Sequence, residues 1–350
     1  MNNYFSRKAA TITPYQAGAQ PQGSGIIKLN TNENPYPPSP KAREVLAGFN
    51  SEYLRLYPRP DSGVLRQAVA DVYGLLPQNV FCGNGSDEVL GFAFQAFFDG
   101  DVVFPDITYS FYPVWAELFG ITYRTVPLKD DFTVPVDAMT GSGVVIANPN
   151  APTGIALSRD DIRRILERNS AHVVLVDEAY ASFGSGTVAD LIVEYPNLLV
   201  VTTLSKSHGL AGLRVAFALG QPHLIDGLTR IKDSFNSYPV DTLAEEVAAA
   251  ALRDTAYCTE VSAKIIATRE RTAQRLRELG FTVLPSKTNF VFAMHPNIRA
   301  TALKDYLEAS RIYVRHFNQP RIGEYLRITI GTDEQMDMML DRVAAYKPVG

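Results

Sequence analysis

Short apolar runs alternate with amphipathic stretches through the middle of the chain. Residues 144–147 (Val-Val-Ile-Ala), 173–176 (Val-Val-Leu-Val) and 198–201 (Leu-Leu-Val-Val) contain no polar side chain. Runs of this kind are typical of strands that are buried on both faces. Between the first two runs, Ser158 can cap a helix that continues to Arg168. The alternation predicts an α/β fold, in which helices flank a mostly parallel central sheet.

The two ends of the chain carry different patterns. The first 40 residues or so are rich in Pro, Asn and Gln and cannot form a core alone. From residue 243 a helical pattern runs to residue 277, and apolar runs at 281–284 and 289–292 and a helix from Asp333 follow. This order predicts a smaller α+β unit. We therefore expect three parts, which are an N-terminal arm that covers the site (1–28), a large domain (29–240) and a small C-terminal domain (241–350).

Composition narrows the class of protein. The 350 residues carry a formal net charge of −4 without a cluster of Lys and Arg, which argues against nucleic acid or an anionic membrane as a partner. No apolar run reaches the ~18 residues of a membrane span, and the start lacks the layout of a signal peptide. The cysteines and histidines have no disulfide or metal-site spacing, so we expect no metal. These features predict a soluble, cytoplasmic protein.

Candidate chemistry lies at the ends of the predicted strands. A Gly-rich turn at 83–88 precedes an apolar helical run, and such a helix start can bind an anion, although an ordinary capped turn has the same pattern. Asp177 and Lys206 each follow an apolar run, at the edge where ligands of open parallel sheets bind. A lone lysine is usually a surface charge. Together, however, the carboxylate, the amine and the helix start match the ring nitrogen, the aldehyde and the phosphate of a phosphorylated pyridine aldehyde.

These motifs and several others resemble those of the fold-type-I aminotransferases, which depend on pyridoxal 5′-phosphate, and specifically those of the histidinol-phosphate aminotransferases. The resemblance extends over nearly the whole chain. Each motif is weak alone, but their shared order is specific. The matching segments are 30–36 (Asn-Thr-Asn-Glu-Asn-Pro-Tyr), 57–58 (Tyr-Pro), 83–88 (Gly-Asn-Gly-Ser-Asp-Glu), 148–154 (Asn-Pro-Asn-Ala-Pro-Thr-Gly), 177–180 (Asp-Glu-Ala-Tyr), 205–206 (Ser-Lys), 209–214 (Gly-Leu-Ala-Gly-Leu-Arg) and 326–329 (Leu-Arg-Ile-Thr).

The resemblance implies a role for each residue around the cofactor. Lys206 forms the Schiff base and later moves a proton between substrate and cofactor. Asp177 keeps the pyridine nitrogen protonated, and Tyr180 hydrogen-bonds the 3′ oxygen of the ring. The other implied cofactor contacts are Tyr109, which stacks on the ring, and the phosphate ligands Ser86, Asp87, Ser205, Arg214 and Tyr57. Since Tyr57 would come from a neighbouring subunit, the resemblance also implies a homodimer.

One position departs from the family's pattern. The family usually has Asn immediately before Pro-Thr-Gly, where this chain has Ala151. The contact that this Asn makes to the 3′ oxygen is then made by Asn150, or Tyr180 acts alone.

Three further residues resemble substrate-binding positions. Arg327 is similar to the arginine that binds the α-carboxylate across the superfamily, and Arg315 and Tyr15 match positions that contact the substrate phosphate in histidinol-phosphate enzymes. A guanidinium group suits carboxylate and phosphate alike, and a doubly charged phosphate favours two cations. The implied reaction is transamination of L-histidinol phosphate with 2-oxoglutarate, which gives imidazole-acetol phosphate and L-glutamate in histidine biosynthesis.

Three alternatives stay open at this point. Aromatic amino-acid aminotransferases have closely similar sequences. A decarboxylase of a phosphorylated amino acid would release carbon dioxide and need no oxo acid. A non-catalytic sensor with this fold would bind the cofactor but transfer no amino group.

Overall fold

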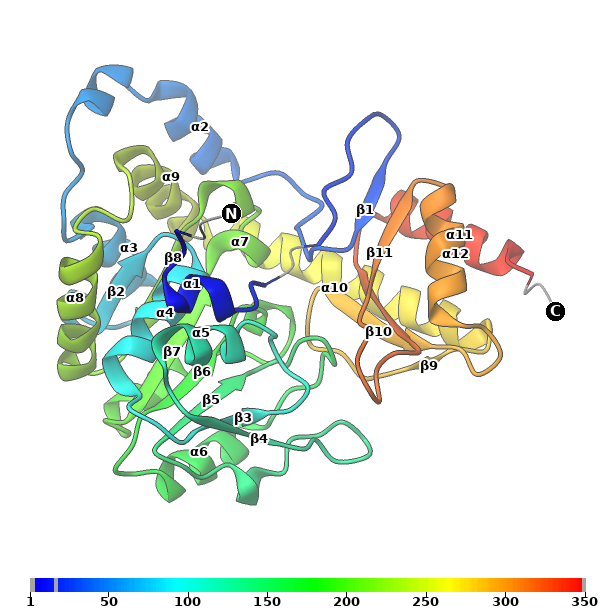
Figure 1. Ribbon diagram of the computed structural model, residues 1–350. Helices are drawn as coiled ribbons and strands as arrows, with labels where there is room; N and C mark the ends of the chain where they lie inside the picture. The colour runs from blue at the N-terminus through cyan, green and yellow to red at the C-terminus, as the bar shows by residue number, and fades with distance from the viewer. Residues whose placement is uncertain (1–3, 16–17, 348–350) are drawn as a thin grey trace.

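Two β-sheets with helices packed against them form the body of the molecule in the computed structural model, which describes residues 4–15 and 18–347 (Figure 1). The larger sheet has the strand order β2-β8-β7-β6-β5-β3-β4. Only β8 runs antiparallel to its neighbours, β2 and β7, so the predicted mostly parallel sheet is confirmed. The seven strands are β2 (Val80–Gly83), β3 (Val102–Pro105), β4 (Tyr123–Val126), β5 (Gly143–Ala147), β6 (Val174–Asp177), β7 (Leu198–Thr203) and β8 (Ala216–Leu219).

The central strands of this sheet are buried on both faces because each alternate side chain enters a different hydrophobic core. In β5, Val144 and Ile146 belong to one core and Val145 to the other. This is why the predicted strands carry no polar position. Helices α3 (Gly63–Tyr73), α6 (Arg159–Arg168) and α9 (Thr242–Arg253) contribute to the first core, and α4 (Ser86–Phe97), α5 (Tyr112–Phe119) and α8 (Pro222–Phe235) contribute to the second.

The second sheet has five strands in the order β1-β11-β12-β10-β9 and a core of its own. Its strands are β1 (Ile27–Leu29), β9 (Thr282–Val283), β10 (Phe290–Met294), β11 (Ile312–His316) and β12 (Tyr325–Thr329), and its helices are α10 (Thr255–Glu278), α11 (Ala300–Ala309) and α12 (Asp333–Ala345). The predicted helix from Asp333 is therefore confirmed, and the two predicted apolar runs correspond to β9 and β10. The boundaries between arm, large domain and small domain stay predictions.

The helical pattern predicted over residues 243–277 forms two helices. These are α9 and α10, which are separated at Asp254, whose backbone leaves the helical region (φ −93°, ψ 54°). In the described part of the chain, no helix is both long and apolar enough to cross a membrane.

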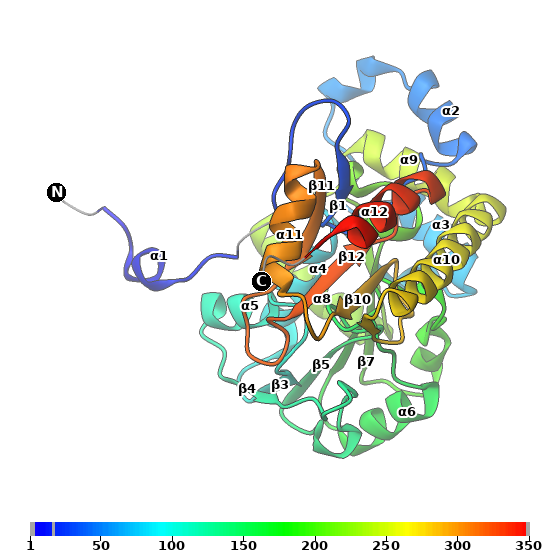
Figure 2. The same ribbon diagram turned by 90° about the vertical axis from the view of Figure 1, so that its right-hand side faces the viewer.

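One part of the N-terminal segment packs into the body of the molecule, and another part extends away from it. Strand β1 pairs in parallel with β11 at the edge of the second sheet, so residues near the start of the chain complete a sheet built otherwise from its end. Helix α1 (Arg7–Thr11) has no buried residue and stands clear of the body (Figure 2). Helix α2 (Pro40–Gly48) lies against α9. Of the segment predicted to cover the site, residues 1–3, 16 and 17 lie outside the described residues.

Candidate active site

A cavity of about 490 Å³ lies at the carboxyl ends of β6 and β7 and is also lined by side chains from β11 and β12. Its position follows the rule that open parallel sheets bind ligands beyond the carboxyl ends of their strands. All but two of the predicted site residues line it. Those that do are Tyr15, Ser86, Asp87, Tyr109, Asp177, Tyr180, Ser205, Lys206, Arg214, Arg315 and Arg327.

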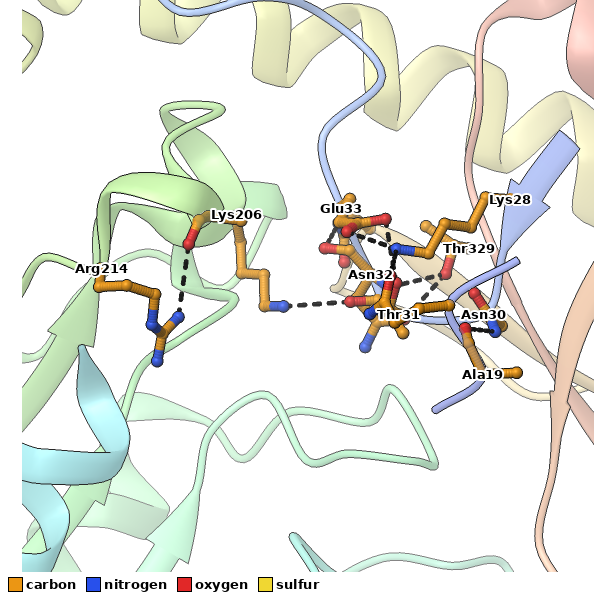
Figure 3. Close-up of polar contacts among 12 residues, drawn as sticks. Ala19, Lys28, Asn30, Thr31, Asn32, Glu33, Lys206, Arg214 and Thr329 are labelled. Carbon is orange, nitrogen blue, oxygen red and sulfur yellow. Dashed lines mark hydrogen bonds and ion pairs between the residues drawn. The ribbon is translucent and has the colours of Figure 1, made fainter. Parts of the chain in front are cut away.

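Lys206 reaches the cavity from the short helix α7 (Leu204–Ser207), which follows β7 directly. The Thr203 hydroxyl caps this helix by accepting the Ser205 N–H at 3.2 Å. The Lys206 Nζ donates to the carbonyl of Thr31 at 3.2 Å, and Figure 3 shows the side chain pointing toward that segment. Burial, with the nearby Arg327 charge, lowers the pKa of Lys206 to about 8. A much larger fraction of this amine is therefore neutral near pH 7 than for a surface lysine.

Asp177 is the last residue of β6, and its side chain is 6% exposed. Burial raises the pKa of its carboxyl to about 6, and a hydrogen bond from the Tyr112 hydroxyl at 2.9 Å opposes that shift. The Ala179 N–H donates to the other carboxylate oxygen at 3.2 Å. A cation placed opposite Asp177 would favour its charged form. Tyr112 did not appear among the sequence candidates, because a fully buried tyrosine in an apolar helix gives no local sign of its partner.

The Gly-rich turn at 83–88 lies where β2 leads into α4. Gly85 precedes the helix with φ 83° and has no side chain that could cap its first N–H groups. A Cβ at this position would collide with the Arg214 guanidinium, so Gly85 lets that cation lie against the helix start. The Asp87 carboxylate accepts the Tyr109 hydroxyl at 2.9 Å and lies 3.5 Å from Arg214. The free helix N–H groups and the cation suit an anion such as a phosphate.

On the opposite wall, two arginines face each other across neighbouring strands, with Arg315 and Arg327 as register partners of β11 and β12. The Arg327 guanidinium donates to the Asn30 carbonyl at 3.0 Å and lies over the rings of Phe290 and Phe317, at 5.3 and 5.4 Å from their centroids. Its Nε is buried without a hydrogen-bond partner among the described residues. An unsatisfied buried donor of this kind favours an anionic ligand.

Two predicted site residues lie away from this cavity. Asn150 is buried, and its amide is engaged by Thr108 at 2.8 Å and by the Ile107 carbonyl at 3.0 Å. The neighbouring Ala151 lines the cavity in its place. Tyr57 is 84% exposed and stacks on Tyr238 with centroids 4.9 Å apart.

Tyr180 contacts Asn32, which the sequence indicated only as part of the motif at 30–36. The Asn32 amide donates to the Tyr180 hydroxyl at 2.8 Å, and burial raises the pKa of that phenol. Tyr15 stacks on Phe111 with centroids 4.8 Å apart and so lies at the mouth of the cavity. The motif at 30–36 was the available signal for Asn32, but the contact joins residues 148 positions apart.

Similar proteins of known family match this chain over nearly its full length. The family model for aminotransferase class I and II matches residues 24–343. A histidinol-phosphate aminotransferase of a Marinomonas species is 54% identical, covering 96% of this chain and 97% of the relative. The one from Acetobacter pasteurianus is 52% identical, covering 97% of both. The crystal structure of histidinol-phosphate aminotransferase from Sinorhizobium meliloti in complex with pyridoxal-5′-phosphate superposes with a TM-score of 0.81 at 25% identity, covering 91% of this chain and 90% of that one.

Proposed function

The chain belongs to the class I and II aminotransferases, and from that premise we propose that it transfers the amino group of L-histidinol phosphate to 2-oxoglutarate. The products are imidazole-acetol phosphate and L-glutamate, as in histidine biosynthesis. The observation that carries this function is the full-length identity of more than half to histidinol-phosphate aminotransferases. The cavity supports it with a buried amine opposite a pair of arginines.

The residues of the cavity fit pyridoxal 5′-phosphate. When bound, this cofactor supplies an aldehyde that condenses with amines and a protonated ring that withdraws electrons from them. The Asp177 carboxylate would face the ring nitrogen and hold its proton. Tyr109 would cover one face of the ring. The N–H groups of Ser86 and Asp87 would hold the phosphate, together with Ser205 and Arg214.

Lys206 is the residue that would accept and donate protons during the reaction. Because its lowered pKa leaves part of the amine neutral near pH 7, it can react with the aldehyde and, once free, take a proton from the substrate carbon and return it at another atom. The Thr31 carbonyl, 3.2 Å from Nζ, would keep the free amine inside the cavity. The Asn150 amide already forms hydrogen bonds with Thr108, the Ile107 carbonyl and Thr153, which supports the proposal that Tyr180 contacts the 3′ oxygen alone.

Arg315 and Arg327 would bind the anionic end of each substrate in turn. Two guanidinium groups on facing strands can hold the phosphate of histidinol phosphate, and the same pair can hold a carboxylate of 2-oxoglutarate. Tyr15 would close over this end from the arm. We also propose a homodimer, in which Tyr57 would reach the phosphate of the partner subunit's cofactor. The exposed, stacked pair of Tyr57 and Tyr238 supports it. A location in the cytoplasm is part of the same proposal.

The test is a substrate panel with purified holoenzyme, read by glutamate formation. We expect turnover with histidinol phosphate to exceed turnover with phenylalanine and tyrosine. In Arg315→Ala, kcat/KM for histidinol phosphate should fall about tenfold to a hundredfold, as expected for a lost charge-assisted hydrogen bond. The kcat/KM for an aromatic amino acid should change less, because kcat/KM for the amino donor does not depend on the binding of 2-oxoglutarate. Good turnover of the aromatic amino acids with none of histidinol phosphate would reject this substrate but leave the aminotransferase class intact.

A further inference from the structure

Asn32 lies at the centre of a buried hydrogen-bond network between Tyr180 and the second sheet. Its side chain is 2% exposed, and its backbone is left-handed with φ 56°, which Asn tolerates better than most residues. The Asn289 amide donates to the Asn32 carbonyl at 3.0 Å. Figure 3 shows Asn32 with Thr329, whose hydroxyl lies 3.0 Å from both the backbone N–H and the side-chain oxygen of Asn32. Contacts on every side therefore hold this residue in place.

The hydrogen bonds of this network have a defined direction. The Thr329 hydroxyl accepts from the Asn32 backbone N–H and donates to the side-chain oxygen of Asn32. The NH₂ of the same side chain donates to the Tyr180 hydroxyl. Because the Tyr180 oxygen accepts from this NH₂, the single proton of the phenol is directed elsewhere, and Tyr180 lines the cavity.

The residues just before Asn32 touch the other functional groups of the cavity. The Asn30 carbonyl accepts from Arg327, and the Thr31 carbonyl accepts from Lys206. Three consecutive residues thus contact the predicted substrate arginine, the predicted Schiff-base lysine and the tyrosine beside them. Within this segment, Asn32 is the residue whose side chain acts on Tyr180.

We propose that Asn32 is a positioning residue that acts through Tyr180, by directing the phenol proton to the ring oxygen of the bound cofactor. This deepens the function proposed above, and it rests on pyridoxal phosphate in this cavity but not on the identity of the substrate. A hydrogen bond from Tyr180 stabilises negative charge on that oxygen. The ring oxygen would then attract less strongly the proton that it would share with the Lys206 nitrogen. The pKa of that proton would therefore be lower.

The experiment is a pH titration of the visible absorbance of the holoenzyme without substrate. Asn32→Gly keeps the left-handed backbone but removes the amide, so we expect the midpoint of the absorbance change to rise by about one pH unit. Asn32→Asp has nearly the same shape, but its second oxygen can only accept from Tyr180 and would turn the phenol proton away from the cavity. We expect a larger rise in this variant.

A double-mutant cycle with Tyr180→Phe tests whether Asn32 acts through Tyr180. In the Tyr180→Phe background, Asn32→Gly should cause no further shift of the midpoint. Cofactor affinity by absorbance titration and thermal unfolding of each variant provide the controls for folding. The proposal is overturned if both Asn32 variants keep the wild-type midpoint, or if the shift persists in full without the Tyr180 hydroxyl. Since no substrate is present, this outcome is independent of whether histidinol phosphate is turned over.

Discussion

At the scale of single residues, burial sets the charge of the two groups that would contact the cofactor. Asp177 ends β6, and Lys206 lies in the short helix that follows the neighbouring strand β7. Both are shifted toward neutrality, with pKa values of about 6 and about 8, and burial is the largest cause of each shift. Tyr112 limits the shift of Asp177 by donating to it, whereas among the described residues the Lys206 amine has a carbonyl as its hydrogen-bond partner.

From the lowered pKa of Lys206 we predict how the rate at which the cofactor-free protein reacts with pyridoxal phosphate depends on pH. Only the neutral amine attacks an aldehyde, so its reaction with pyridoxal phosphate should accelerate about tenfold per pH unit below pH 8 and level off above about pH 8. A lysine at its ordinary pKa would continue to gain rate until about pH 10. Stopped-flow measurement of the visible absorbance would follow the reaction, with Lys206→Ala as the control that develops none. A continued rise through pH 10 would contradict a buried, partly neutral amine.

At the scale of secondary-structure elements, the turn between β2 and α4, the helix that would bind the phosphate, requires glycine at position 85. Gly85 combines a positive φ with close approach by Arg214. Gly74, at the end of α3, has a similar φ of 65°, but a Cβ there would meet nothing within 4 Å. Gly74 therefore provides a control in which a Cβ strains the backbone but displaces no cation.

This pair predicts different results for two alanine substitutions. Gly74→Ala should lower the free energy of unfolding by about 1–2 kcal/mol and leave cofactor affinity unchanged, because only the left-handed backbone is strained. Gly85 has φ 83° and ψ 160°, a region that is essentially restricted to glycine, so Gly85→Ala should lower the free energy of unfolding more than Gly74→Ala does. It should also push Arg214 away, so cofactor affinity should fall about tenfold to a hundredfold. Chemical denaturation and cofactor titration measure the two quantities. Equal cofactor affinity in both variants would show that Arg214 does not need the space at Gly85.

At the scale of the whole molecule, the two sheets are joined by contacts around the cavity. Arg321, in the loop between β11 and β12, donates to the carbonyls of Leu128 and Lys129 at 2.9 and 2.6 Å and lies 5.2 Å from the centre of the Phe132 ring. The hairpin that carries Arg315 and Arg327 is thereby fixed against the loop that follows β4 of the large sheet. The two arginines owe their position to these contacts as well as to their own strands.

The proposed homodimer makes a prediction that mixed dimers can test. If Tyr57 serves the partner subunit, then neither Lys206→Ala nor Tyr57→Ala homodimers contain a wild-type site, but a dimer of one chain of each contains one. Co-expressed mixed dimers should therefore regain about half of the wild-type cofactor sites, with wild-type affinity. Differently tagged chains would allow their purification, and cofactor titration would count the sites. If the mixed dimers do not regain wild-type cofactor affinity, Tyr57 contributes to the site of its own subunit or to no cofactor site.

The sequence by itself determined the features that depend on neighbouring residues. The runs at 144–147, 173–176 and 198–201 predicted parallel strands buried on both faces, because a strand between two cores has no polar position. Their ends placed Asp177 and Lys206 at one edge of the sheet, and both line the same cavity. Motif order was sufficient for the family, since eight weak motifs in the same order are jointly specific.

Only the tertiary structure decided which distant residues meet. Strand β1 joins the second sheet, and Asn32 contacts Thr329 although 297 residues separate them. Asn150 was a reasonable candidate for the ring oxygen from its motif, but its amide is already bonded to Thr108 and the Ile107 carbonyl. The physical reason is the same in each case. Hydrophobic periodicity and turn chemistry act over a few residues, whereas the partner of a buried polar group depends on how the whole chain folds back on itself.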